Sequence, residues 1–240
     1  MARRIAWIAD DLGLSREVNE AILHTHHRGV LTGAALLMGQ PGTGHAVERA
    51  RETPSLEVGW HLHLVDSQPS TRPAWPWGSS PWKAGLALAV WPPARRLARR
   101  EIEHQWRLYR ETGLPCRFVN AHHHLHFHPF VRKMLLRTLP EDFSGWLRWG
   151  RVGAFDGGLG ERWGFGALNR VLALQRTRVP LPVSSTLWGL DRTFSMDAEE
   201  ILGILPTLGE GLHEFLFHPR RIDPGDADTR CLVDLADRAL

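Results

Sequence analysis

The sequence predicts a parallel α/β protein whose strands close into a β/α barrel, with residues 1–240 forming one domain. Short apolar segments alternate with helical segments along the whole chain, which is the order typical of a parallel sheet. Acidic or histidine side chains fall at the carboxyl ends of four predicted strands. In a barrel these ends share one face, whereas an open doubly wound sheet spreads them along a crevice. The convergence of four strand ends therefore favours the barrel.

We expect about seven strands, each followed by a helix or a loop. The strands are expected at residues 5–9, 32–38, 56–64, 117–121, 146–152, 183–187 and 214–217. The helices are expected at residues 16–28, 45–51, 94–109, 129 onward, 167–176, 198–205 and 226–239. Residues 66–82 and 155–166 are expected to be long loops rich in Trp, and loops of this length often cover a site.

Composition and charge exclude several classes of protein. A hydrophobic content of 43% is enough for a core, and a formal charge of +3 over 240 residues gives little support for a nucleic-acid partner. Cys116 and Cys231 form no disulfide framework, which fits a reducing compartment. The first residues lack the long apolar run of a signal peptide or membrane span, so we expect a cytoplasmic protein.

Two adjacent acids, Asp10 and Asp11, close the first predicted strand, and Ser15 is a suitable N-cap for the helix that follows. Paired carboxylates at the end of a buried strand can bind a metal ion or act as a base. They can also merely cap the strand-to-helix turn. Both interpretations stay open at this point.

His61 and His63 lie near the end of the third predicted strand, and the alternation of side chains sends both to one side. A pair of this kind serves as metal ligands about as often as it fills a core. The last strand ends similarly at His218, which Pro219 follows.

The fourth predicted strand runs into a cluster that holds five of the fourteen histidines within residues 122–128. If the backbone stays extended, His122, His124, His126 and His128 project to one side and His123 to the other. Pro129 suits the first turn of a helix. Imidazole is the commonest metal-binding side chain, and two of them can hold a divalent ion if a carboxylate or third histidine joins them.

Four motifs together resemble the signatures of the YdjC-like carbohydrate deacetylases over nearly the whole chain: Ala9-Asp10-Asp11-Leu12-Gly13, Gly59-Trp60-His61-Leu62, Asn120-Ala121-His122-His123-His124-Leu125-His126 and Phe217-His218-Pro219. Within that family the chain is most similar to the hopanoid-biosynthesis-associated deacetylases. The resemblance implies an irregular β/α barrel that removes an N-acetyl group from an amino sugar with the help of a metal ion. Leu12, Trp60 and Arg220 depart from the family pattern, which bears on substrate shape.

The resemblance also implies roles for individual residues. Asp11, His61 and His122 would bind the metal, Asp10 would act as the base and His218 as the acid. These residue types suit that chemistry, because two imidazoles and one carboxylate leave positions open for water and for the acetamide oxygen. His63, His124 and His126 are expected to orient the ligands. Ligand type favours zinc, whereas the family is often associated with magnesium.

The implied substrate is an N-acetylated amino sugar, either soluble or carried on a lipid of the hopanoid type. The segments 75–82 and 146–163 carry six of the eleven tryptophans and favour sugar stacking or peripheral contact with the inner membrane face. A phosphoesterase is an alternative, but it would need further carboxylates for a second metal, and the sequence shows no such cluster. A non-catalytic metal- or sugar-binding protein is another, but it would need neither Asp10 nor His218.

Overall fold

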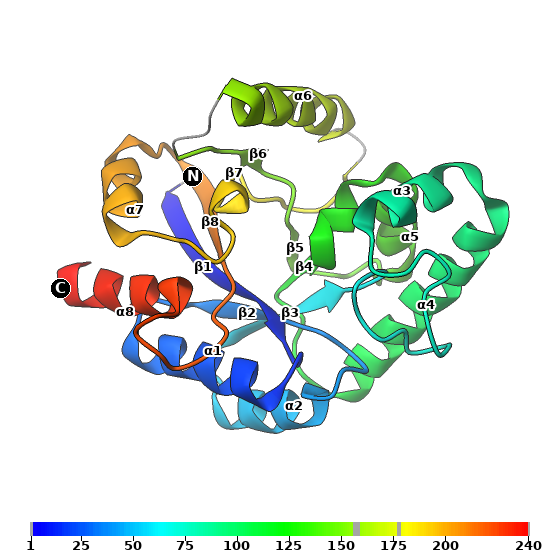
Figure 1. The fold of residues 1–240 in the computed structure, drawn as a ribbon, viewed down its shortest axis with the longest axis horizontal. Coiled ribbons are helices and arrows are strands. Elements are labelled where there is room, and N and C mark those ends of the chain that lie inside the picture. Colours follow the sequence, from blue (N-terminus) through cyan, green and yellow to red (C-terminus); the bar gives the residue numbers. More distant parts are fainter. Residues whose placement is uncertain (1, 156–158, 177–178, 240) are drawn as a thin grey trace.

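The computed structural model describes residues 2–155, 159–176 and 179–239, and its centre is one parallel sheet that curls on itself (Figure 1). The sheet order is β5-β4-β3-β2-β1-β8-β7-β6. The strands are β1 (Arg3–Leu12), β2 (Gly33–Leu36), β3 (Glu57–Leu62), β4 (Phe118–Ala121), β5 (Trp146–Leu147), β6 (Arg151–Val152), β7 (Thr186–Trp188) and β8 (Gly211–Phe217). The predicted α/β barrel is therefore confirmed.

Helices surround this sheet on its outer side (Figure 1). They are α1 (Arg16–Arg28), α2 (Thr43–Glu52), α3 (Pro81–Val90), α4 (Pro92–Glu111), α5 (Pro129–Thr138), α6 (Leu159–Gln175), α7 (Ala198–Ile204) and α8 (Ala227–Ala239). Among the described residues, short 3₁₀ turns lie between strands and helices at η1 (His122–Phe127), η3 (Leu190–Arg192) and η4 (Leu205–Thr207). Ser15 caps α1 as expected, since its side chain accepts from the Val18 amide. The Asp197 side chain caps α7 by accepting from the Glu199 and Glu200 amides. No helix among the described residues is long and apolar enough to span a membrane.

The single strand predicted at residues 146–152 is split into the two edge strands of the sheet. β5 pairs with β4, while β6 pairs with β7 at the opposite edge. At the end of β5 the Leu147 amide donates to the Pro182 carbonyl at 2.9 Å, and just after it the Arg148 amide donates to the Val119 carbonyl at 3.0 Å. The segment from β5 to β6 therefore bonds to both edges of the sheet, and this makes the barrel irregular. The Arg148 side chain lies inside the barrel.

The core lies on both faces of the sheet, as the continuous apolar strands require. Ile8, Trp60 and Phe215 are fully buried in it. Gly59 shows how closely the strands are packed, because a Cβ there would lie 2.4 Å from the Phe118 ring. The glycine thus lets an aromatic ring of β4 lie against the backbone of β3, two residues before His61.

Two details of the prediction are wrong. The histidine cluster is not extended: residues 122–127 form η1, and His123 and His124 are left-handed, with φ values of 51° and 54°. A turn is needed here because the chain must reverse into α5, which begins at Pro129 as expected. The loop expected at 155–166 overlaps α6, which already begins at Leu159.

Candidate active site

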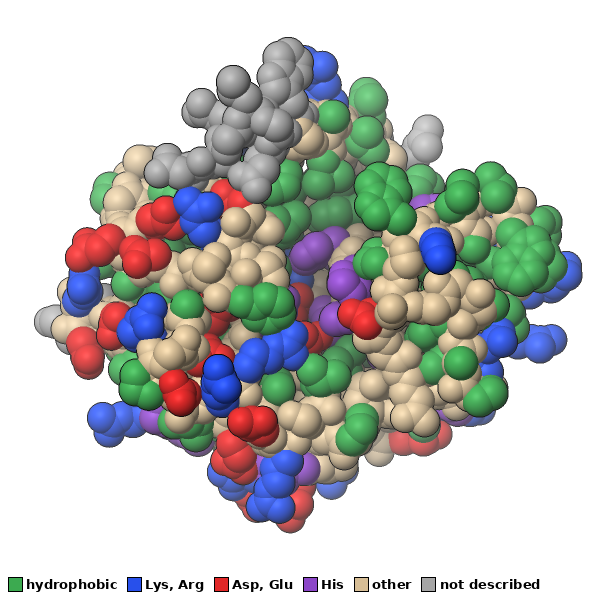
Figure 2. All heavy atoms as spheres, in the orientation of Figure 1, with side chains coloured by type: hydrophobic (Ala, Val, Ile, Leu, Met, Phe, Trp, Pro, Cys, Tyr) green, Lys and Arg blue, Asp and Glu red, His purple; other side chains and the backbone are tan. Residues whose placement is uncertain are grey.

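The polar strand ends meet in a hollow at the centre of the face shown in Figure 2, where histidine side chains gather beside acidic ones. β1 supplies Asp10 and Asp11, β3 supplies His61, and η1 supplies His122 directly after β4. His218 follows β8. A cavity of about 320 Å³ opens beside His218 and is lined by Phe194 and Arg220 among others. The larger cavity of about 700 Å³ lies at the opposite ends of the strands, away from these groups.

Asp11, His61 and His122 form an inner cluster whose three ligand atoms lie within 4.8 Å of one another. Asp11 Oδ1 is 3.4 Å from His61 Nε2 and 3.0 Å from His122 Nδ1. Asp11 Oδ1 and His61 Nε2 are buried without a hydrogen-bond partner in the described structure. Buried polar atoms of this kind need a partner, and one carboxylate with two imidazoles is a donor set suited to zinc. The residues present therefore fit a metal ion.

Asn120 fixes the protonation pattern of His61. Its Nδ2 donates to Asp10 Oδ1 at 2.8 Å, and this assigns the amide orientation, because an ionised carboxylate only accepts. Its Oδ1 then faces His61 Nδ1 at 2.5 Å, so that this ring nitrogen carries the proton. In the neutral ring His61 Nε2 then keeps its lone pair for the inner cluster, although the carboxylates of Asp10 and Asp11 outweigh burial and raise the pKa of the ring. Partners of this kind hold a metal-binding imidazole in the correct tautomer.

Arg148 is fully buried between two carboxylates. It donates to both oxygens of Asp10 at 2.6 and 2.9 Å and to Glu214 Oε1 at 2.7 Å. Burial opposes ionisation of Asp10, but Arg148 outweighs it and holds the pKa of Asp10 well below its ordinary value. One cation can neutralise only one of its two partners, so burial raises the pKa of Glu214 to about 7.

His218 is placed by its backbone, whose amide donates to Asp228 Oδ2 at 2.6 Å. Burial lowers the pKa of its ring to about 4 despite the nearby carboxylates of Asp10 and Asp11. The ring is therefore neutral at neutral pH in the free protein. Its Nδ1 is buried without a hydrogen-bond partner in the described structure. The centroids of the His218 and Phe194 rings are 5.1 Å apart.

Arg220 contacts the inner cluster directly. Its Nη2 lies 3.0 Å from Asp11 Oδ2, the oxygen that does not face the two histidines. Its guanidinium lies over the Phe194 ring, 4.8 Å from the centroid. Arg220 thus contacts a candidate metal ligand and also lines the cavity beside His218.

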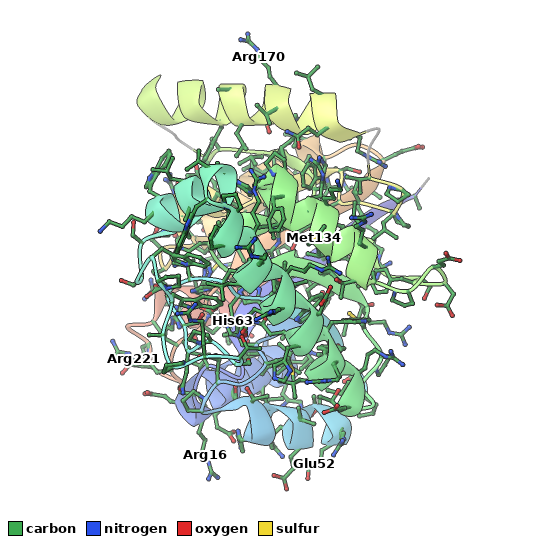
Figure 3. The ribbon with its side chains drawn as sticks, turned by 90° about the vertical axis from the view of Figure 1, so that its right-hand side faces the viewer. Arg16, Glu52, His63, Met134, Arg170 and Arg221 are labelled. Atoms are coloured by element: carbon green, nitrogen blue, oxygen red, sulfur yellow. The ribbon has the colours of Figure 1, made fainter. Side chains whose placement is uncertain are left out.

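The three histidines expected to orient the ligands do not do so through any hydrogen bond among the described residues. His63 is enclosed in the fold, as Figure 3 shows, and contacts the Met38 carbonyl and the Ser67 hydroxyl at 2.8 Å each. Burial lowers its pKa to about 4. The rings of His124 and His126 lie next to each other, with 6.0 Å between their centroids. Neither ring nitrogen of His126 has a hydrogen-bond partner among the described residues.

Sequence reasoning gave Asn120, Arg148 and Glu214 no role in holding Asp10 and His61. Each is a polar residue inside a predicted apolar strand, where an unpaired polar group is costly, and that placement was the available signal. It also missed Asp66, which lies 3.1 Å from His123 Nε2 and groups with His122 and His123 as a second set that could hold an ion. No cluster of further carboxylates was expected here, and among the described residues one carboxylate, Asp66, joins two histidines beside the inner cluster.

Residues 4–235 match the YdjC-like protein family. The chain belongs to that family. Among its relatives, a carbohydrate deacetylase of Brevibacillus brevis is 33% identical over 135 residues, which cover 55% of this chain and 54% of that protein. A carbohydrate deacetylase of Vibrio campbellii is 30% identical over 139 residues, which cover 56% of this chain and 55% of that protein. The chain thus spans about half the length of the curated relatives that it matches.

A crystal structure from Enterococcus faecalis V583, provisionally described as a cellobiose-phosphate cleavage protein, has the same fold as this YdjC-like chain. The TM-score is 0.67 at 20% identity, and the match covers 99% of this chain and 94% of the other. At that identity the likeness shows the fold alone. It extends the barrel assignment to both ends of the chain.

Proposed function

We propose that this protein is a metal-dependent deacetylase that removes the N-acetyl group from an amino sugar. The observation that carries the proposal is the inner cluster at the carboxyl ends of the strands, with the oxygens of Asp10 and the ring of His218 beside it. The relatives named as carbohydrate deacetylases support the same reaction class. A non-catalytic binding protein would need no acid–base pair beside the inner cluster, whereas Asp10 and His218 both stand next to it.

Asp11, His61 and His122 would hold the metal ion. When bound, the ion supplies Lewis acidity, polarising the acetamide carbonyl and lowering the pKa of a water molecule. The inner cluster has one hard oxygen and two borderline nitrogens, so zinc fits it better than magnesium, which prefers oxygen ligands. Asn120 keeps His61 ready to ligate, and Arg220 restrains the second oxygen of Asp11.

Asp10 would accept the proton as water adds to the carbonyl carbon. Arg148 and Asn120 fix both of its oxygens, so its remaining lone pairs point in a defined direction. His218 would then give a proton to the amine as the C–N bond breaks, leaving acetate and a free amino sugar. Because burial keeps the His218 ring neutral in the free protein, the ring would take up that proton from solvent in the complex with substrate. Asp10 would return to solvent the proton that it accepted from water, so that the protons balance over one turnover.

The finer proposal is that the amino sugar is carried on a lipid of the hopanoid type, with the protein at the inner membrane face. The two Trp-rich segments support it less than expected, because Trp75, Trp77, Trp146 and Trp149 are buried, while Trp163 lies outside the described side chains. Trp75 and Trp77 stack on each other at 5.4 Å and pack under their own loop.

Helix α3 gives separate support for contact with a lipid surface. Trp82, Leu86 and Val90 recur every four residues and are 89%, 65% and 70% exposed, forming an apolar stripe. Figure 2 shows apolar side chains on the surface over α3 at the upper right, beside the central hollow. Lys83 and the exposed Arg96 add positive charge nearby. Apolar anchors with basic neighbours suit an anionic bilayer.

The test compares acetate release from lipid-linked N-acetylglucosamine in anionic vesicles with release from soluble chitooligosaccharides. We expect faster turnover of the lipid-linked substrate and reversible vesicle binding that weakens in Leu86→Ser. Leu174→Ser, which replaces another exposed leucine, on α6, is the control and should bind vesicles as the wild type does. Equal or faster turnover of the soluble substrate, with no vesicle binding at low salt, would assign the enzyme to soluble sugars.

A further inference from the structure

A second group of metal-ligating side chains lies on the solvent side of the inner cluster. Asp66, His122 and His123 form this outer cluster, and their ligand atoms lie within 4.8 Å of one another. His123 Nε2 is 3.1 Å from Asp66 Oδ2, and the His122 and His123 ring centroids are 4.4 Å apart. The set of one carboxylate and two imidazoles is chemically the same as that of the inner cluster.

The backbone brings these side chains together by unusual conformations. Asp66 and His123 are both left-handed, with φ values of 50° and 51°, although neither is glycine. Because His123 leaves the extended path, its ring lies beside that of His122 and does not point to the opposite side of the chain. The loop after β3 then carries Asp66 against it.

We propose that the outer cluster binds a second divalent transition-metal ion, with zinc as the expected occupant, and that it does so more weakly than the inner cluster. The side chains of Asp66 and His123 are 52% and 34% exposed, whereas those of Asp11 and His61 are each 1% exposed. Exposed ligands are more mobile and more strongly hydrated, so an ion gains less from binding them.

The two clusters share His122, and this couples their occupancies. An ion in the outer cluster engages an imidazole that the inner cluster also uses, and two dications so close together repel each other. The outer ion also lies on the open side of the site, where substrate would enter. Excess zinc should therefore inhibit acetate release. This consequence rests on the proposed function, whereas the binding itself does not.

The direct test counts zinc ions bound by the purified protein in equilibrium dialysis against zinc alone, from chelator-buffered to micromolar concentrations. The wild type should bind one tight and one weaker zinc ion. Asp66→Asn and His123→Gln should each lose the weaker ion and keep the tight one. Asp142→Asn and His27→Gln, which change an exposed aspartate and an exposed histidine elsewhere, should keep both.

A single zinc ion in the wild type at every concentration would overturn the outer site and leave the proposed function intact. Persistence of the weaker ion in both Asp66→Asn and His123→Gln would overturn the outer site as well, because that ion would then bind elsewhere. If the wild type bound no zinc at all, both clusters would be overturned as metal sites, and with them the metal dependence in the proposed function. Loss of zinc inhibition in the two outer-cluster variants, alongside loss of the weaker ion, would support the coupling through His122.

Discussion

Arg148 holds Asp10 by both carboxylate oxygens, with Nη1 2.6 Å from Oδ2 and Nη2 2.9 Å from Oδ1. The same guanidinium binds Glu214, and all three side chains are excluded from solvent. This triad joins the segment between β5 and β6 to β1 and β8, so that it both positions Asp10 and closes the barrel.

Arg148→Met should lower the free energy of unfolding by about 3–5 kcal/mol, because it leaves two carboxylates buried without their cation. Urea unfolding of the chelator-treated protein measures the change. Arg151→Met, three residues along and exposed, is the control and should change the free energy by about 0.5 kcal/mol or less. Equal effects of the two substitutions would show that the triad contributes little.

The strands could be predicted from the sequence because buried parallel strands are local apolar runs, and all seven expected segments carry strand. The site could be predicted only in part. Asp10, Asp11, His61, His122 and His218 stand at strand ends, which a local pattern reveals. The bonds from Asn120 to His61 and Asp10 join residues 59 and 110 positions apart, and no local pattern encodes such partners. The turn at His123 depends likewise on where α5 must begin.

Asn120→Leu should weaken zinc binding by about 10- to 100-fold, because His61 loses the acceptor that fixes its tautomer. Competition with a chelator of known affinity measures this change. Asn19→Leu removes another buried asparagine, whose bonds go to Gly13, Gly42 and His45, and serves as the control. Unaltered zinc affinity in Asn120→Leu would show that Asn120 does not orient His61.

Glu214 should make the protein less stable as pH rises. Its pKa in the folded protein is about 7, against 4.5 for the unfolded chain, so the folded state holds the proton more tightly. Its stabilising contribution is complete below the unfolded pKa and is lost as pH rises through the folded pKa, by up to about 1.4 kcal/mol per pH unit. Glu214→Gln stays neutral at every pH, so its free energy of unfolding should lack this fall with pH. Urea unfolding of both chelator-treated proteins between pH 4.5 and about 7 measures the difference. Parallel slopes in both proteins would contradict the raised pKa.

His218→Ala should keep the metal ion and lose activity by roughly 10²- to 10⁴-fold, the range typical of a general acid or base. The defect should shrink with acetamides whose leaving amine is less basic, because such amines depart with less help from an acid. Acetate release from a series of N-acetyl compounds that differ in amine basicity measures this trend. A defect of constant size across the series would make His218 a positioning residue.

The most direct test of the central claim is the metal content of the purified protein, measured together with acetate release from an N-acetylglucosaminyl substrate. We expect His61→Ala and His122→Ala to lose both the tight ion and the activity, since two ligands cannot hold it. Asp10→Asn should keep the ion while turnover falls by roughly a hundredfold or more. Full occupancy by the tight ion in His61→Ala or His122→Ala, or undiminished acetate release after the ion is removed, would contradict a metal-dependent deacetylase centred on Asp11, His61 and His122.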